Sequence, residues 1–320
     1  MLESALQRRA HPWSRIPGVA YMLFSLATLF AVTSKGFLDS ANLTNVAMQS
    51  TLLLLLALPM TLIIMTEGID LSMGAVLTLA CVVLAAVAVQ TGSVVVALIA
   101  ALAVGLVFGF VNGWLVAALG LPPFVATLGT MGIAQGLALV ATDGQSITGV
   151  GDNVTFFYAG RIAGVPVPLL IAAAAYFAIH WLLYRTRFGG YVFALGGNPE
   201  ALRLAGVRAD FFLVCVYALG GVMAGVAALL LTARMSAGHP TAAIGMEFDA
   251  IAAVAVGGTS FEKGNGWLPG TVLGVVTVGV LRNGLNLLAI PSSVQVVAIG
   301  VLVITALWVD GFKARLVVGG

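Results

Sequence analysis

The sequence carries very little charge. Only 8% of its 320 residues are Asp, Glu, Lys or Arg, whereas 61% are hydrophobic, and the mean hydropathy is +1.10. Soluble domains carry about 25% charged residues, so this composition excludes a soluble globular domain. Apolar runs long enough to cross a bilayer follow one another along the chain. The sequence therefore predicts an integral membrane protein with many helices, and it gives no support for nucleic acid binding.

Cysteine, histidine and catalytic motifs are also scarce. Cys81 and Cys215 lie in separate apolar runs and the three histidines are scattered, so no disulfide framework or metal site is predicted. The chain contains no Walker A phosphate-binding motif, no HExxH pair and no GxSxG elbow. We therefore expect no enzyme activity and no cofactor in this chain. Energy for any transport would come from a partner or from an ion gradient.

The apolar runs predict an all-α polytopic membrane protein with about ten transmembrane helices. The membrane domain covers residues 16–310, between an N-terminal segment 1–15 and a tail 311–320. The eighth run is too short for a full crossing and is interpreted as a shortened or half-broken helix. The predicted spans are 16–33, 46–66, 72–90, 92–119, 122–140, 165–184, 211–232, 246–256, 268–289 and 292–309. In the fourth, Gly105, Gly109 and Gly113 form a flat face for close helix packing.

The distribution of basic residues predicts the orientation, because cytoplasmic loops are enriched in Lys and Arg. With ten spans, both termini and the polar stretch around residues 185–210 fall on the cytoplasmic side. If the eighth span were re-entrant, the last two spans would flip. That flip would leave Lys313 and Arg315 outside, whereas with ten spans ten of the fourteen basic residues lie inside: Arg8, Arg9, Arg15, Arg185, Arg187, Arg203, Arg208, Lys263, Lys313 and Arg315.

A short autonomous helix is predicted within this polar stretch, at residues 199–205. Asn198 is a good N-cap, Pro199 suits the first helical position, and Gly206 suits the position after the C-cap. The helix would be about 10 Å long, too short to cross a bilayer. From periodicity alone, an interfacial turn that holds two spans apart is favoured over a docking helix.

Sequence blocks spread along the chain resemble permease subunits of ribose-type ABC sugar importers. ALGGNPEALRLAGV (194–207) resembles the coupling segment of that family. EGIDLSMG (67–74), LPPFVATLGTMG (121–132), ARMSAGHPTAAIGMEFDAIAAVAVGGTS (233–260) and NGLNLL (283–288) resemble further blocks, in the family's order. Together they cover most of the chain, which is more specific than any single motif.

The resemblance implies a type II ABC importer-like permease in a bacterial inner (cytoplasmic) membrane, moving a ribose-like pentose or related sugar by alternating access. It implies a cytoplasmic ATP-binding subunit that holds ATP and Mg, a periplasmic or external sugar-binding protein, and a second permease subunit, identical or not. An ABC permease for an amino acid or nucleoside and an ion-coupled secondary transporter remain alternatives. The coupling segment is 186–209, with the ATPase contact at Asn198, Pro199, Glu200, Ala201, Leu202, Arg203, Leu204, Ala205 and Gly206.

Three polar residues of the ninth predicted span are candidates for the substrate pathway. Arg282, Asn283 and Asn286 have helical spacing that directs them toward a common interior. Amides can both donate and accept hydrogen bonds, which suits a neutral sugar. Hydrogen bonding between helices is an equally good interpretation. Relatives in the resembling family tend to have Asn where this chain has Arg282.

Two further groups of charged residues are candidate functional positions. Glu67 and Asp70 lie in a break between two spans, where a structural role near the pathway is expected, with Asp70 capping the third span. Arg234, His239, Glu247 and Asp249 gather near the outer ends of the seventh and eighth spans. As exposed charges they would dock a substrate-delivering protein or would simply be solvated.

Overall fold

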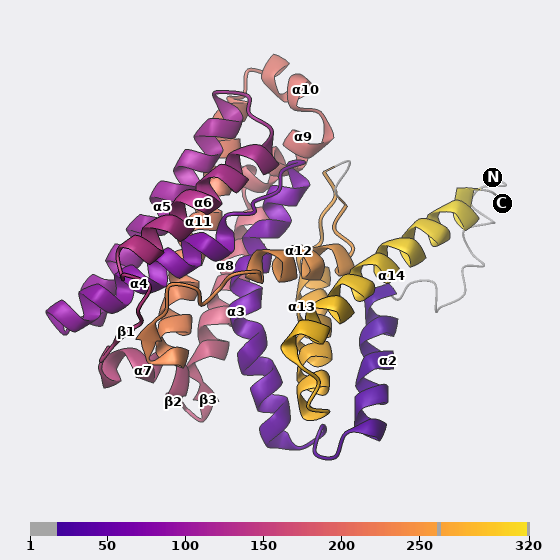
Figure 1. Cartoon of the computed structure of the whole chain (residues 1–320). Coiled ribbons are helices and arrows are strands. Elements are labelled where there is room, and N and C mark those ends of the chain that lie inside the picture. Colours follow the sequence, from indigo (N-terminus) through magenta and orange to yellow (C-terminus); the bar gives the residue numbers. More distant parts are fainter. Residues whose placement is uncertain (1–17, 261–263, 319–320) are drawn as a thin grey trace.

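A computed structural model describes residues 18–260 and 264–318 of the chain, which fold mainly into helices (Figure 1). Helices suit a membrane because each satisfies its own backbone hydrogen bonds. The elements in chain order are α2 (Gly18–Thr33), α3 (Ser40–Met65), α4 (Met73–Thr91), α5 (Val94–Ala117), α6 (Pro123–Val140), β1 (Ile147–Thr148), α7 (Asp152–Ala159), β2 (Arg161–Ile162), β3 (Val165–Pro166), α8 (Val167–Arg185), α9 (Arg187–Gly197), α10 (Pro199–Leu204), α11 (Ala209–Met235), β4 (Ala237–Gly238), α12 (Met246–Val256), α13 (Leu268–Leu287) and α14 (Ser292–Val318).

Seven of the described helices are long and apolar enough to cross a membrane. They are α3, α4, α5, α6, α8, α11 and α13, while α2 and the described apolar part of α14 are shorter. Helix α12 has 11 residues, which gives it a length of about 16 Å against a hydrocarbon core of roughly 30 Å. It lies near the middle of the molecule, between the two ends reached by the longer helices (Figure 1).

The helix pair α5 and α11 packs backbone against backbone. A Cβ atom added at Gly105 or Gly109 of α5 would collide with the main chain of α11, and one at Gly221 would collide with the main chain of α5. Small residues allow this close approach between membrane helices. The flat glycine face predicted for the fourth span is thereby confirmed.

A second close pair is formed by α12 and α13. Gly257 and Gly270 face each other so closely that a Cβ on either would collide with the carbonyl of the other, and Gly274 lies against the backbone at Ala253. Between the two close pairs runs α3, whose residues from Thr51 to Met65 are almost all buried and form the centre of the hydrophobic core. Two tightly joined helix pairs therefore flank α3 (Figure 1).

The two ends of the bundle carry different short elements. Helices α9 and α10 lie at one end, and α7 with the β2–β3 hairpin lies at the other (Figure 1). In the hairpin, Arg161 pairs with Pro166 and Ile162 with Val165. A second antiparallel pair joins β1 to β4, with Ile147 opposite Gly238 and Thr148 opposite Ala237.

Each predicted span contains a helix, in the predicted order, but the count of about ten membrane crossings is not confirmed and several boundaries differ. Helix α3 begins at Ser40, six residues before the predicted span 46–66, and α14 continues through the predicted tail to Val318. The stretch between the fifth and sixth predicted spans contains α7, and the stretch before α10 forms an additional helix, α9. The predicted N-terminal segment 1–15 and Lys263 lie outside the described residues.

Candidate functional site

A polar cavity of about 680 Å³ lies among α3, α11, α12, α13 and α14. Its polar lining includes charged and amide side chains from all five helices, which is unusual among helices that are mostly apolar. These side chains are Gln49, Arg234, Asp249, Arg282, Asn286 and Gln295. Such a cavity with convergent polar groups is the default candidate for a binding site or passage.

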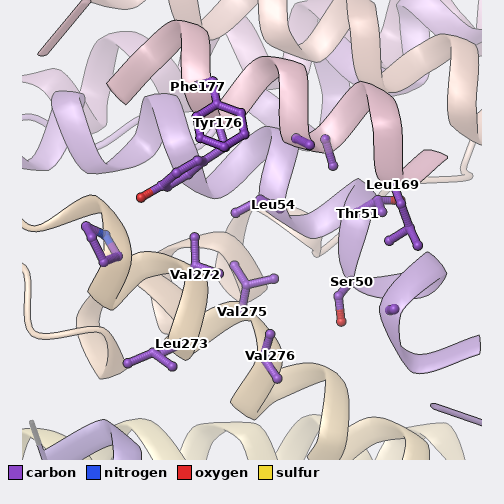
Figure 2. A pocket seen from close by; sticks show the side chains of 14 residues that line it. Ser50, Thr51, Leu54, Leu169, Tyr176, Phe177, Val272, Leu273, Val275 and Val276 are labelled. Atoms are coloured by element: carbon purple, nitrogen blue, oxygen red, sulfur yellow. The ribbon is translucent and has the colours of Figure 1, made fainter. Parts of the chain in front are cut away.

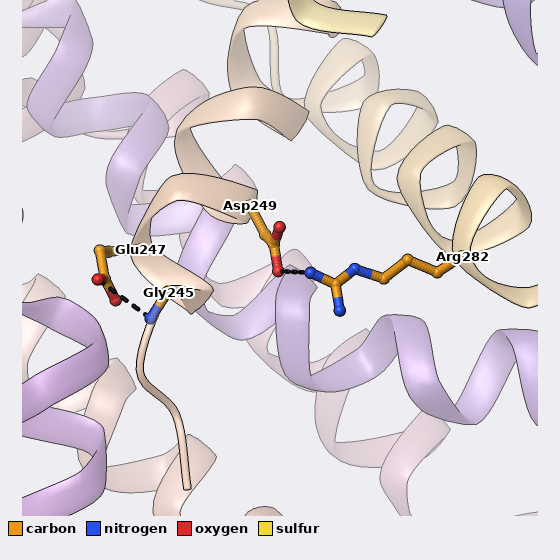
Figure 3. A network of polar contacts seen from close by, with 4 residues as sticks. All are labelled: Gly245, Glu247, Asp249 and Arg282. Carbon is orange, nitrogen blue, oxygen red and sulfur yellow. Dashed lines mark hydrogen bonds and ion pairs between the residues drawn. The ribbon is translucent and has the colours of Figure 1, made fainter. Parts of the chain in front are cut away.

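An ion pair crosses the cavity wall between α12 and α13. The Nη2 atom of Arg282 donates a hydrogen bond to Oδ2 of Asp249 (Figure 3). The Asp249 side chain is largely buried, while the Arg282 side chain remains partly open to the cavity. A buried charge needs a partner because removing it from water costs several kcal/mol. Each of these two charges is therefore stabilised by the other.

Two amides continue the polar wall toward α14. The Nε2 atom of Gln295 donates to Oδ1 of Asn286 at 2.7 Å and to the carbonyl oxygen of Ile290 at 2.9 Å. These bonds connect the end of α13, the turn after it and the first part of α14. Gln295 was not predicted as a site residue, although an amide in an apolar run is a signal that could have found it.

The three candidate pathway residues of α13 do not share one face. Arg282 and Asn286 line the cavity, whereas Asn283 is buried and pairs with Asn42 of α3. In that pair Asn42 Nδ2 donates to Asn283 Oδ1 at 3.0 Å, and Asn283 Nδ2 donates to Asn42 Oδ1 at 2.9 Å. Asn283 thus lies in a helix-to-helix contact, the alternative interpretation of the same sequence pattern.

A second cavity of about 640 Å³ lies on the other side of α3, against α8 and α13 (Figure 2). Its walls are mostly Ala, Leu and Val, with Ser50, Thr51 and Tyr176 as the polar exceptions. The Thr51 hydroxyl already donates to the Met48 carbonyl at 2.6 Å. A polyhydroxylated solute would lose more hydrogen bonds here than it could regain, so the first cavity is the better candidate for a polar substrate.

Asp70 organises a buried polar network at the break between α3 and α4. Its Oδ1 accepts hydrogen bonds from the backbone and the hydroxyl of Ser72, at 2.8 and 2.6 Å. Asn112 donates to the Ser72 hydroxyl at 2.8 Å, and Thr130 donates to Asn112 at 2.6 Å. Asp70 therefore supports Ser72, which occupies the N-cap position of α4, and does not itself occupy that position. Glu67 is exposed and has a positive φ of 60°.

The charged residues near the start of α12 differ from the expected exposed cluster. Glu247 is only 3% exposed, and its Oε1 accepts a hydrogen bond from the backbone of Gly245 at 3.2 Å (Figure 3). Asp249 is also buried, so neither carboxylate presents itself to a docking protein. Arg234 is exposed, with its guanidinium 5.9 Å from the ring centre of Tyr158, and His239 is half-buried.

The short helix α10 forms as its end signals predict. Asn198 Oδ1 accepts a hydrogen bond from the backbone of Ala201 at 2.9 Å. At the other end, Gly206 has φ +79° and donates to the Arg203 carbonyl, while Val207 donates to the Leu202 carbonyl. This is the Schellman arrangement, for which glycine is the favoured residue. The helix ends at Leu204, one residue before the predicted end.

The apolar residues of α10 point in two directions. Leu202 is 8% exposed and packs with Leu195 of α9 and Ala209 of α11, whereas Leu204 is 86% exposed. Arg203 forms an exposed ion pair with Asp210 at 2.7 Å. Leu202 therefore anchors α10 to the bundle, and Leu204 is the apolar side chain that a partner could bind. Pro199, Glu200, Ala201 and Ala205 are exposed as well.

These features define a class of protein. A bundle of apolar helices that encloses a polar cavity and exposes a short capped helix at one end is typical of a membrane permease. The chain belongs to the family described as the permease component of branched-chain amino acid transport systems, which matches residues 42–307. It is a multi-pass inner-membrane protein and a transport subunit.

Curated relatives resemble the chain over almost its whole length. The ribose import permease protein RbsC of Bacillus subtilis (strain 168) is 39% identical over 294 residues, which cover 91% of each chain. The D-allose transport system permease protein AlsC of Escherichia coli (strain K12) is 35% identical over 92% of this chain and 90% of its own. The galactose/methyl galactoside import permease protein MglC of Salmonella typhimurium is 32% identical, covering 97% and 98%. No solved structure matches the chain.

Proposed function

We propose that this chain is the membrane-spanning permease subunit of an ATP-driven ABC importer for a monosaccharide. Relatives named for ribose, allose and galactose support the choice of substrate class. The polar cavity supports it as well, because its amides and its ion pair supply both donors and acceptors for sugar hydroxyls. Arg282 and Asn286 line the route, and Asn283 positions α13 against α3 beside it.

The observation that carries the proposal is the anchored and exposed helix α10. Leu202 fixes it to α9 and α11, while Leu204 stays available at the surface. An ATPase subunit that binds Leu204 and the polar side chains of α10 would pass its motion directly into α11. Because α11 is joined backbone to backbone with α5, the force would reach the bundle as a whole. The cavity then opens alternately to the two sides of the membrane.

The proposed topology has about ten crossings, with both termini and α10 in the cytoplasm of a bacterium. In this arrangement α12 and the chain that precedes it together make the eighth crossing, with the helix covering only part of the depth. The exposed basic residues Arg185, Arg187, Arg203 and Arg208 then lie on the cytoplasmic side. Glu67 and the Asp70 network brace the break between α3 and α4 near the cytoplasmic end of the pathway.

Three partners complete the proposed transporter. A cytoplasmic subunit binds ATP and Mg and contacts α10. A periplasmic or external sugar-binding protein docks near Arg234 and His239, the two candidates of that region that are not buried like Glu247 and Asp249. A second permease subunit, identical or a sister chain, forms the other half of the route.

Reconstitution tests the proposal. The permease is co-expressed with a candidate ATPase subunit and a candidate binding protein, placed in proteoliposomes, and supplied with labelled D-ribose, D-allose or D-galactose. We expect uptake that requires ATP and the binding protein and that resists an ionophore. Uptake abolished by the ionophore would identify an ion-coupled transporter instead. Uptake of an amino acid or nucleoside, with no sugar taken up, would contradict the monosaccharide assignment.

A further inference from the structure

An exposed aromatic ring lies in the polar cavity. Phe248 is one of the residues that line it, and its side chain is 58% exposed. Its two neighbours on α12 are buried, with Glu247 against α4 and Asp249 against Arg282. A phenyl ring left uncovered beside charged groups is unfavourable unless something covers it. It therefore presents a flat apolar surface to whatever enters the cavity.

The groups around this ring have unused hydrogen-bonding capacity. Gln295 uses Nε2 to bind Asn286, which leaves the Asn286 amide nitrogen and the Gln295 carbonyl oxygen without a recorded partner within the described residues. On the other wall, Asp249 keeps one carboxylate oxygen and Arg282 keeps further N–H groups beyond their mutual bond. Free donors and acceptors thus line the same cavity as the exposed phenyl ring, on α12, α13 and α14.

We propose that the cavity is a defined binding site for one sugar ring and not a featureless passage. Phe248 covers the C–H face of the ring, while the Asp249–Arg282 pair and the Asn286–Gln295 pair bind its hydroxyls. This arrangement fits a pyranose or furanose, which has apolar faces and polar edges, and binding sites commonly combine an aromatic surface with a few placed polar groups. The inference rests on the proposed sugar import and adds Phe248, Asp249 and Gln295 as specificity-determining residues.

The test is equilibrium binding of labelled D-ribose, D-allose and D-galactose to the purified permease–ATPase complex in detergent, without the binding protein. Wild type is expected to bind at least one of these sugars. Phe248→Leu should weaken that binding about tenfold, which is the loss of one good aromatic contact, and Phe248→Trp should retain it. Phe124→Leu is the matched control, because Phe124 of α6 is 55% exposed but lies outside the cavity.

A second variant tests the polar edge without leaving a charge unpaired. Asp249→Asn combined with Arg282→Gln keeps two hydrogen-bonding side chains facing each other, so the complex should retain its thermal stability while losing at least tenfold in sugar affinity. Wild-type affinity in both Phe248→Leu and the double variant would overturn the inference, as would a wild-type complex that binds none of the three sugars. ATP-driven uptake by that same non-binding complex would show that the import function stands and that only the binding site is wrong.

Discussion

Arg282 of α13 forms an ion pair with Asp249 of α12 in the wall of the polar cavity. Within residues 18–260 and 264–318, it is the only ion pair that faces this cavity. The pair joins residues that are 33 positions apart in the sequence, and its energy depends on both partners being present. A lone charge in a membrane interior is far more costly than a matched pair. This relationship makes the two positions suitable for a double-mutant cycle.

Removing one partner of this pair should destabilise the protein more than removing both. Asp249→Asn alone leaves the Arg282 guanidinium without its carboxylate, and we expect a loss of about 2 kcal/mol, less than for a fully buried pair because Arg282 is partly exposed. Arg282→Gln alone should cost a similar amount. The double variant should recover most of the loss. Thermal unfolding in detergent measures all four proteins, and strictly additive losses would show that the two residues are not coupled.

Substitutions of Leu202 and Leu204 should both impair ATPase binding, but only the Leu202 substitution should lower the stability of the protein. Leu202→Asp places a charge among Leu195 and Ala209, so α10 should detach, with lower thermal stability and loss of ATPase binding. Leu204→Asp alters a side chain that touches little of this chain. It should leave stability unchanged and still abolish ATPase binding or stimulated hydrolysis. Normal hydrolysis in Leu204→Asp would show that the partner does not bind α10 through this residue.

Gly206 should tolerate no branched or bulky residue. Its φ of +79° costs other residues roughly 1–2 kcal/mol, so Gly206→Leu should loosen the end of α10 and weaken ATPase binding while the protein still inserts in the membrane. Gly190→Leu on the neighbouring α9 is the control, because that glycine has open space and no positive φ. If Gly206→Leu binds the ATPase subunit as well as Gly190→Leu does, the glycine at the C-terminal end of α10 has no role in ATPase binding.

Substitutions of the two asparagines of α13 should have different effects, one on stability and the other on transport. Asn283→Leu breaks the pair with Asn42, so we expect a stability loss near the average of about 0.6 kcal/mol for polar pairs in membranes. Replacing both Asn42 and Asn283 by Leu should restore stability and uptake. Asn286→Leu should reduce sugar uptake with little change in stability, because Asn286 is exposed to the cavity. Normal uptake by Asn286→Leu would exclude it from the route.

Cysteine labelling tests the topology, which depends on how α12 is counted. In a background with Cys81 and Cys215 replaced by Ala, cysteines introduced at Ser260 and Ala314 should react only with reagents admitted to the cytoplasm. A cysteine at Asn153 of α7 should react from outside. Reaction of the cysteine at position 314 with an impermeant external reagent would place the last two helices in the opposite orientation.

Local signals were predictable from the sequence, and helix orientation was not. Asn198, Pro199 and Gly206 act within one short segment, so the limits of α10 could be predicted to within one residue. The direction of Asn283 depends on how α13 is rotated against α3, which spacing within α13 does not determine. The same holds for the burial of Glu247 and Asp249, because burial depends on neighbouring helices that are distant in sequence.

Helix α9 shows a different limit. Its 11 residues include four glycines, which disfavour a helix in isolation. Tertiary packing overrides that preference, since Gly196 lies against the backbone of Met65 and of Gly264. The contact requires glycine at this position. Glycine therefore lowers the intrinsic helix propensity of α9 but also allows α9 to pack closely against its neighbours.

The glycine contacts also determine which parts of the molecule can move independently. Sliding α5 along α11, or α12 along α13, would bring side chains to close contacts where only glycine fits, so we expect each pair to move as one rigid piece. The polar cavity takes Arg234 from the first piece and Asp249 and Arg282 from the second. A change in the separation of the two pieces would therefore move Arg234 relative to an ion pair that stays intact. Gating by such a movement would alter the width and shape of the cavity while its paired charge is conserved, so the transport cycle would not have to break a salt bridge inside the membrane.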